Sequence, residues 1–418
     1  MKVVAGISNR FTVRTTVVAS GSEAIAPFGR RSLISRLPQS EVVAWLRHGE
    51  GLVGWGSATS LVLNGRDRFD RAREWLADVF GGASTEDAAG VPGSGPVAFG
   101  SFSFDSASAS TSSVLIVPRV IFGRRDGLTW RTTIGDRTEP AVRPRPAVVP
   151  SGVRWADGEV DAARNLRAVA AAVKHIRTGT LSKVVLARDL VAVADTPIDT
   201  RVLLHRLADL SPSGYTFACA GLVGSTPELL VRRMGGDIES LVLAGTAVDE
   251  PGNESAGAKL LSSAKDREEH AYAADMVRAT LAPMCDELVA PRGPELLCLS
   301  KLIHLATSIR GRLTQEHSVL DIVEALHPTP AVAGYPTDTA LDVIRELEVM
   351  DRGRYAGPVG WIDANGDGEW GIALRCAQIE GNKARLYAGG GIVGASDPAT
   401  ELSETQAKFE VMRRAIEG

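Results

Sequence analysis

Residues 161–193, DAARNLRAVAAAVKHIRTGTLSKVVLARDLVAV, decide the fold class. The first part spaces its apolar residues three and four positions apart and ends at Gly179, which is typical of a helix with a glycine stop signal. The second part, 183–193, is rich in β-branched residues and predicts a strand. A helix and a long strand this close together indicate a protein that mixes helices and sheet.

The same patterns continue on both sides of this stretch. Further strands are predicted at 11–19, 51–63, 97–104, 113–122, 128–133, 215–222, 228–233, 238–243, 301–313, 360–363, 370–379 and 384–393. Further helices are predicted at 69–80, 263–288, 337–348 and 397–416. Because the strands outnumber the helices and mostly follow one another directly, we expect an α+β fold. A large, mostly antiparallel sheet would then form the core, with layered helices flanking it.

Two stretches read as linkers or long loops, 82–96 and 136–152, and the second holds four prolines between positions 140 and 150. Proline removes a backbone donor and denies both helix and central strand. We therefore divide the chain into residues 1–150, an N-terminal part of the same fold, and residues 151–418, its larger C-terminal part.

Composition and charge exclude several classes of protein. The 418 residues carry 46 Lys and Arg against 50 Asp and Glu, with a balance of +5 over residues 1–150 and −9 over 151–418. A mildly acidic chain has no electrostatic footprint for nucleic acid. No apolar run reaches the ~18 residues of a membrane span, and the N-terminus does not resemble a signal peptide. We expect a cytoplasmic protein whose four cysteines are buried free thiols.

Three motifs look like binding sites without meeting the requirements. Residues 363–370, DANGDGEW, begin like a calcium loop, but the twelfth position is Leu374 rather than glutamate, so a hairpin turn is the better interpretation. Residues 252–259 place an alanine before the lysine that a phosphate loop needs after its second glycine. The glycines at 389–391 precede no helix and predict a close backbone approach instead.

Two acidic pairs have the spacing of one helical face: Asp266 with Glu269, and Glu401 with Glu404. Four carboxylates converging from two helices would repel one another, and their hard oxygens suit Mg²⁺. Spacing alone equally fits solvated helix faces, or negative charges that favour a helix N-terminus.

Nine ordered segments together resemble the chorismate-utilising enzymes, most closely the isochorismate synthases. They are SKVVLARDL (182–190), STPELLVRR (225–233), LAGTA (243–247), SAKDREEH (263–270), KLIHLATSIRGRL (301–313), ALHPTPAVAGYP (325–336), GPVGWIDANGDGEW with LRCA (357–377), RLYAGGGIVGASDPATELSET (385–405) and AKF (407–409). The resemblance is dense over about 160–418 and weak at 95–105. It implies a large sheet core with helices around it and an active site deep in a cleft.

The resemblance assigns the chemical roles. Lys183 matches a general base that takes a proton from the attacking water, and Glu228 matches a general acid that protonates the departing hydroxyl. In this reaction water adds at C2 of chorismate, the C4 hydroxyl leaves, and the product is isochorismate. A lysine base must be neutral and a glutamic acid donor must be protonated, which a closed cleft favours.

The resemblance also assigns the binding residues. Glu269 and Glu404 match direct Mg²⁺ ligands, and Asp266 and Glu401 match a second pair that acts directly or through water. The remaining positions match substrate-binding groups: Arg375 and Tyr387 at the enolpyruvyl carboxylate, with Gly389, Gly391, Lys408, Gly245, Thr246 and His304 lining the site. For His304 an orienting role and a direct catalytic role are equally open.

Three related activities compete with isochorismate formation. Anthranilate synthase-type members carry glutamine where this chain has Lys183, and aminodeoxychorismate synthase-type members carry lysine where it has Ala244. Salicylate synthase, which goes on to eliminate pyruvate, is the main alternative. A non-catalytic, metal-dependent binding protein on the same scaffold is the remote one. We expect chorismate as substrate, Mg²⁺ as cofactor, no nucleic-acid or membrane partner, and a monomer or weak oligomer in menaquinone or siderophore biosynthesis.

Overall fold

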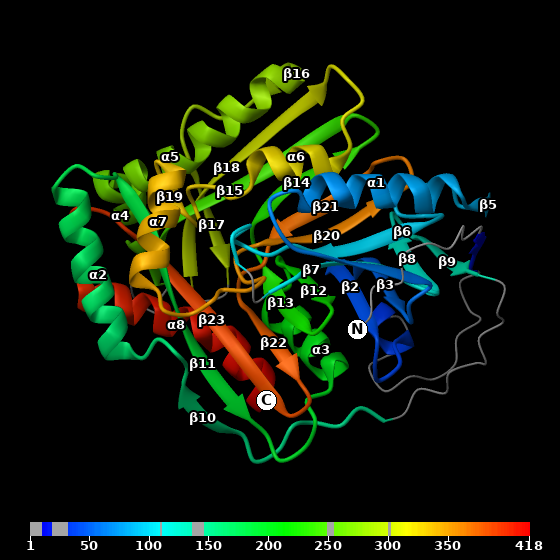
Figure 1. Ribbon diagram of the computed structural model, residues 1–418, viewed down its shortest axis with the longest axis horizontal. Coiled ribbons are helices and arrows are strands. Elements are labelled where there is room, and N and C mark those ends of the chain that lie inside the picture. The colour runs from blue at the N-terminus through cyan, green and yellow to red at the C-terminus, as the bar shows by residue number, and fades with distance from the viewer. Residues whose placement is uncertain (1–10, 19–31, 109–110, 136–145, 249–254, 300–301) are drawn as a thin grey trace.

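Two large sheets form the centre of the protein, and eight α-helices surround them in the part of the chain that the structure describes (Figure 1). This computed structural model describes residues 11–18, 32–108, 111–135, 146–248, 255–299 and 302–418. Of the paired strands described, only β1 and β5 run parallel; the other pairs are antiparallel. The α+β fold with large antiparallel sheets is therefore confirmed.

The first sheet has 13 strands and draws on both halves of the chain. In spatial order it contains β10 (Arg154–Asp157), β11 (Lys183–Val193), β23 (Lys383–Ile392), β22 (Cys376–Glu380), β13 (Leu222–Thr226), β12 (Tyr215–Cys219), β2 (Val42–Arg47), β3 (Glu50–Trp55), β8 (Val120–Arg125), β9 (Leu128–Ile134), β1 (Thr12–Val17) and β5 (Ser84–Asp87), with β19 (Gly334–Tyr335) beside β11.

The second sheet has ten strands and also mixes early and late residues. In order these are β16 (Cys285–Val289), β18 (Leu302–Leu313), β15 (Asp237–Val248), β14 (Leu229–Met234), β21 (Gly368–Ile372), β20 (Pro358–Asp363), β6 (Val97–Ser101), β7 (Ser113–Val117) and β4 (Thr59–Leu63), with β17 (Glu295–Leu299) beside β18. A domain boundary at residue 150 stays a prediction, and strands from both sides of it join each sheet.

The helices separate by sheet (Figure 1). Helices α2 (Ala162–Arg177), α3 (Thr200–Leu210), α7 (Thr337–Leu347) and α8 (Pro398–Glu417) pack on strands of the first sheet, whereas α1 (Arg68–Gly81), α4 (Ala256–Ser262), α5 (Ala264–Leu281) and α6 (Val319–Leu326) pack on strands of the second. Short 3₁₀ turns lie at Leu33–Arg36 and Ala282–Met284.

Side-chain caps fix where the functional helices begin. Ser263 accepts a hydrogen bond from the backbone N–H of Asp266, so α5 starts with that aspartate in its first turn. Asp397 accepts one from Thr400 in the same way, and Pro398 follows as the first residue of α8. These caps place Asp266 and Glu401 in the first turns of α5 and α8, where negative charge is favoured.

The two sheets pack face to face around large aromatic side chains. Trp45 of β2 is 1% exposed and donates its indole N–H to Glu369 of β21 at 2.8 Å, which ties one sheet to the other. Behind the first sheet a separate cluster forms where α3 and α8 bury Leu207 and Phe409 against strand residues such as Leu386.

Several predicted elements are wrong at their ends. The strands predicted at 51–63 and 370–379 each split into two pieces that belong to different sheets. The strand predicted at 113–122 breaks at Pro118. The strand predicted at 215–222 turns at Ala220 and Gly221, and both of these residues have left-handed backbone conformations. The helix predicted at 263–288 stops at Leu281, two residues before Pro283, and a strand follows.

Other sequence expectations have mixed outcomes. Residues 363–368 connect β20 to β21 as a hairpin, as predicted, and the Asp363 carboxylate accepts the N–H groups of Asn365 and Asp367. The four cysteines are free, but only Cys219 and Cys376 are buried; Cys285 is partly exposed and Cys298 is exposed. The elements that were not predicted are helices α3, α4 and α6 and strands β2, β5, β10, β16, β17 and β19; of these, β5 lies inside the stretch 82–96 that was expected to be a loop. Most of the 136–152 linker and the predicted N-terminal features lie outside the described residues.

No described helix combines the length and apolar character that crossing a membrane requires.

Candidate active site

Two chain crossings between the sheets create the site. The chain passes from β13 to β14 through Pro227 and Glu228, and from β21 to β22 through residues 373–375. The crossings are bonded to each other, because the Glu228 carbonyl accepts from the N–H of Ile372 at 3.3 Å and the Arg375 carbonyl accepts from Ser225 at 3.2 Å. Glu228 and Arg375 therefore lie close together where the two sheets diverge.

A pocket opens at this point, which we call the active pocket. It contains about 860 Å³ of space, including its open side. Every site residue predicted from the sequence lines it except Lys183: Glu228, Gly245, Thr246, Asp266, Glu269, His304, Arg375, Tyr387, Gly389, Gly391, Glu401, Glu404 and Lys408.

Lys183 lies directly behind the pocket wall at the start of β11. Its side chain has no exposed surface, and its Nζ is 3.2 Å from Oε1 of Glu269, which does line the pocket. Gly391 of the paired strand β23 makes this contact possible, since a Cβ there would lie 2.2 Å from the same Glu269 oxygen and 3.1 Å from Cε of Lys183. The close backbone approach predicted for 389–391 is confirmed.

Glu228 is held as a neutral acid. The residue is only 4% exposed, and burial raises the pKa of its carboxyl to about 8, although the positive charge of Lys183 acts to lower it. At neutral pH the group therefore carries a proton that it can donate. This is the state that a general acid requires.

Three of the pocket's acidic residues each pair with a lysine. Glu269 contacts Lys183, Glu401 accepts from Lys265 Nζ at 3.1 Å and from Ser396, and Glu404 forms an ion pair with Lys408 one turn along α8. Burial, followed by the nearby charge of Glu404, raises the pKa of Glu401. These lysines offset the repulsion between the carboxylates, so that the carboxylates can share one pocket.

The four carboxylates predicted to bind metal are those of Asp266, Glu269, Glu401 and Glu404. Their chemistry fits Mg²⁺, but in this structure they do not form a close cluster. Hard, oxygen-only donors are what Mg²⁺ takes from proteins, commonly one or two carboxylates with waters and an anionic substrate. Yet within the described ranges no three His, Cys, Asp or Glu side chains are close enough together to hold an ion. Which carboxylates would bind the metal directly stays a prediction.

One wall of the pocket has side-chain nitrogens without a hydrogen bond to the described residues. The Nη1 of Arg375 is buried and finds no hydrogen-bond partner among the described residues, and neither does Nε2 of His304. Burial, and then the charges of Arg375 and Lys408, lower the pKa of His304 far below its usual value, so its ring is neutral. Thr246 holds the other ring nitrogen through its hydroxyl at 3.1 Å. This wall suits an anionic ligand.

Gly245 and Gly389 shape the pocket through their backbones. Gly245, at φ +77°, interrupts the register between β15 and β18, so that Thr246 pairs with His304. The carbonyl of Gly389 accepts from Lys408 Nζ at 2.8 Å. Tyr387, two residues earlier on β23, stacks on Tyr355 with 5.1 Å between ring centroids.

A comparison with protein families matches residues 138–417 to the model described as "Chorismate binding enzyme". The chain belongs to this family. The match includes every residue of the active pocket named above, so the family likeness and the pocket coincide.

Individual relatives agree with the family. The chain is 45% identical over 257 residues to isochorismate synthase DhbC of Bacillus subtilis and 41% identical over 252 residues to isochorismate synthase EntC of Escherichia coli. Each match covers 58% of this chain. The first covers 65% of DhbC and the second covers 64% of EntC. The solved structure of MenF, the menaquinone-specific isochorismate synthase of Escherichia coli, superposes with a TM-score of 0.78 at 25% identity, covering 97% of this chain and 94% of MenF.

The structure of this chorismate binding enzyme adds pocket residues that the sequence analysis did not name. Lys265 pairs with Glu401, and its position beside Asp266 in SAKDREEH was the available signal. Arg352 and Tyr355 also line the pocket from the loop that precedes β20. That loop lies just before GPVG, one of the segments that carry the family resemblance. Arg352 forms a buried ion pair with Glu348 at 2.5 Å.

Proposed function

We propose that the protein is an isochorismate synthase, which converts chorismate to isochorismate for menaquinone or siderophore biosynthesis. One observation carries the proposal. A fully buried Lys183 and a buried Glu228, whose carboxyl pKa is raised to about 8, both lie at the same pocket. Both named relatives and the superposed MenF support it, since each is an isochorismate synthase by name.

The residues divide the reaction into a proton removal and a proton donation. In its neutral form, Lys183 accepts a proton from a water molecule as the water oxygen adds to C2 of chorismate. The ring double bonds shift, and the C4 hydroxyl leaves as water with the proton of Glu228. One water enters and one leaves, so the reaction is an isomerisation and needs no redox cofactor. Proton transfer from positioned groups of this kind typically contributes about 10²–10⁴-fold to a rate.

Substrate charge would be met on two sides. Arg375, with its open Nη1, and Tyr387 would hold the enolpyruvyl carboxylate, helped by backbone N–H groups near Gly389 and Gly391. Asp266, Glu269, Glu401 and Glu404 would hold Mg²⁺ in the same pocket. When bound, the ion supplies positive charge that binds and orients the ring carboxylate.

Product analysis with purified protein tests the proposal. With chorismate and Mg²⁺ we expect isochorismate to appear as chorismate is lost, without pyruvate. A Glu228→Gln variant, which keeps size but cannot donate the carboxyl proton, serves as the matched control and should be nearly inactive. Salicylate and pyruvate formed at the rate of chorismate loss would instead identify a salicylate synthase. Absence of any turnover would favour a binding protein.

The protonation of Glu228 predicts the alkaline side of the pH profile. Because the pKa of its carboxyl is raised to about 8, kcat/KM should fall as the pH rises through about 8, by about tenfold per pH unit above it. The ratio kcat/KM is the quantity to follow, since it reports groups of the free enzyme. Circular dichroism over the same range separates this titration from unfolding. A flat profile to well above that pH would remove Glu228 as the acid.

A further inference from the structure

A second cavity lies on the other side of the Tyr355–Tyr387 stack. It shares three wall residues with the active pocket, Arg352, Tyr355 and Tyr387, and contains about 1700 Å³ of space including its open side. Other parts of its wall come from β2, β4, β7, β22, the β12–β13 turn and the loop that carries Arg354. None of the residues assigned to the proposed reaction belongs to it apart from Tyr387.

Arg354 lines this second cavity and is a buried cation without an acidic partner. The residue is 8% exposed, and its guanidinium donates to the carbonyls of Cys219 and Ala220 and to the Gln378 side chain, at 3.2, 2.7 and 2.8 Å. These three bonds leave two of the five guanidinium donors without an acceptor in the described part of the chain. A buried charge is costly unless it is paired.

Two other buried arginines have a carboxylate partner, whereas Arg68, which is 6% exposed, forms no ion pair among the described residues. Arg352, two residues earlier, pairs with Glu348 at 2.5 Å, and Arg201 pairs with Asp199 at 2.6 Å. No carboxylate of the described residues lies within 4.0 Å of Arg354. Burial lowers the pKa of Arg354, and none of the nearby groups that act to raise it is a carboxylate. Its environment thus lacks the negative charge that its neighbours have.

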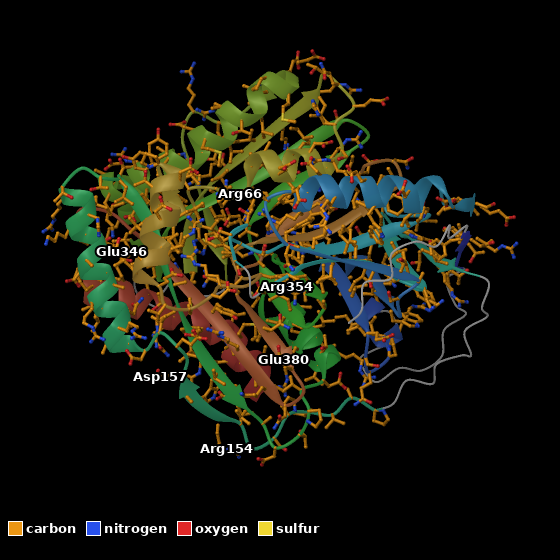
Figure 2. The ribbon with its side chains drawn as sticks, viewed as in Figure 1. Arg66, Arg154, Asp157, Glu346, Arg354 and Glu380 are labelled. Atoms are coloured by element: carbon orange, nitrogen blue, oxygen red, sulfur yellow. The ribbon has the colours of Figure 1, made fainter. Side chains whose placement is uncertain are left out.

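The remaining wall is apolar with a hydroxyl-bearing rim. Five aliphatic side chains contribute to it: Val42, Val62, Val114, Ile116 and Leu222. Hydroxyl groups come from Ser40, Ser57, Ser60 and Ser112. Two glutamates, Glu41 and Glu380, also line the cavity, but both are exposed to water and neither pairs with Arg354. Figure 2 labels Arg354 near the middle of the viewed face and Glu380 below it.

We propose that this cavity is a second binding site, which takes a small organic carboxylate with an apolar body. The carboxylate would occupy the open donors of Arg354, and the body would lie on the aliphatic wall. Such a ligand would supply the missing negative charge, and charge-assisted bonds to a guanidinium are strong. This site goes beyond the proposed reaction and does not depend on it.

The shared wall couples the second cavity to the active pocket. Arg354 and Tyr355 are adjacent in the chain, and Tyr355 stacks on Tyr387 with an interplanar angle of 10°. A ligand on Arg354 therefore contacts the loop that carries one wall of the active pocket. By linkage, a ligand that changes this wall changes the affinity for substrate, and substrate changes the affinity for the ligand equally.

Calorimetric titration with benzoate tests the site on the full-length protein without chorismate. Benzamide, which has the same shape without the charge, is the matched ligand. We expect benzoate to bind and benzamide not to bind. Arg354→Met should weaken benzoate binding by about tenfold or more, the cost of losing a charge-assisted bond. Arg375→Met, which alters the active pocket alone, and the exposed Arg312→Met should retain it.

Each alternative outcome overturns the proposal. Equal binding of benzamide would show that no charge is recognised, and loss of binding in Arg375→Met would place benzoate in the active pocket. Unchanged binding in Arg354→Met, or no binding to the unmodified protein, would remove the site. If Arg354→Met does not fold, the benzamide comparison and Arg375→Met still decide. The coupling is tested separately: benzoate should change the KM for chorismate in the parent but not in Arg354→Met.

Discussion

Replacing Lys183 by alanine is expected to lower kcat by about 10²–10⁴-fold, the range contributed by one positioned acid–base group. The reason is that Lys183 is the only predicted base at the pocket, and the Ala side chain cannot take a proton from water. The measurement is the steady-state rate of isochorismate formation from chorismate with Mg²⁺. Residual activity should be similar in Lys183→Met, which keeps the length of the side chain without its amine.

Folding must be separated from catalysis in this experiment. Lys183 is fully buried and contacts Glu269, so its loss leaves that carboxylate without its partner and lowers stability. Thermal unfolding of each variant measures this effect. Lys383→Ala, on the exposed end of β23, is the matched lysine control and should keep the parent rate. A rate near the parent value in a folded Lys183→Ala would show that the assigned base is wrong.

Glu269→Gln is expected to raise the Mg²⁺ concentration for half-maximal activity by about tenfold or more. Loss of even the outer groups around a metal ion has effects of about 10–100-fold, and a direct carboxylate ligand supplies charge as well. The second readout is calorimetric titration of the protein with Mg²⁺ alone, which needs no turnover. Chelation of Mg²⁺ should remove the activity of the parent protein reversibly.

The neighbouring residue offers a close control. Glu268→Gln makes the same change of charge one position earlier on α5, where the side chain is exposed and bonds to Tyr272. It should leave both the Mg²⁺ titration and the rate unaltered. An unchanged Mg²⁺ response in Glu269→Gln, with a folded protein, would place the metal elsewhere.

Much of the site could be predicted from residue types in ordered motifs. Asp266 and Glu269 share a helical face by spacing, and α5 does place both at the active pocket. The glycines at 389–391 predicted a close approach to the backbone. The missing Cβ of Gly391 leaves room for the side chains of Glu269 and Lys183 to meet. These features depend on a few consecutive residues, so a local pattern is sufficient to indicate them.

Other features could not be read locally. Residues 370–379 look like one strand because apolar and β-branched residues run through them, yet the chain leaves one sheet and enters the other at 373–375. The lysine partners of Glu269 and Glu401 lie 86 and 136 positions away in sequence. Spacing indicates charged helix faces, but only the tertiary structure, which brings Lys183 of β11 to Glu269 and Glu401 of α8 to Lys265, decides which charges meet.

The sequence by itself determined the mixed α+β class, the family resemblance and the identities of the reacting groups, because periodicity and motifs are local properties of the chain. Only the tertiary structure decided their states. It buries Glu228 so that its carboxyl keeps a proton near neutral pH, and it leaves Arg354 beside a cavity without a carboxylate that pairs with it. Both outcomes follow from desolvation and from neighbours distant in sequence, which no single segment encodes.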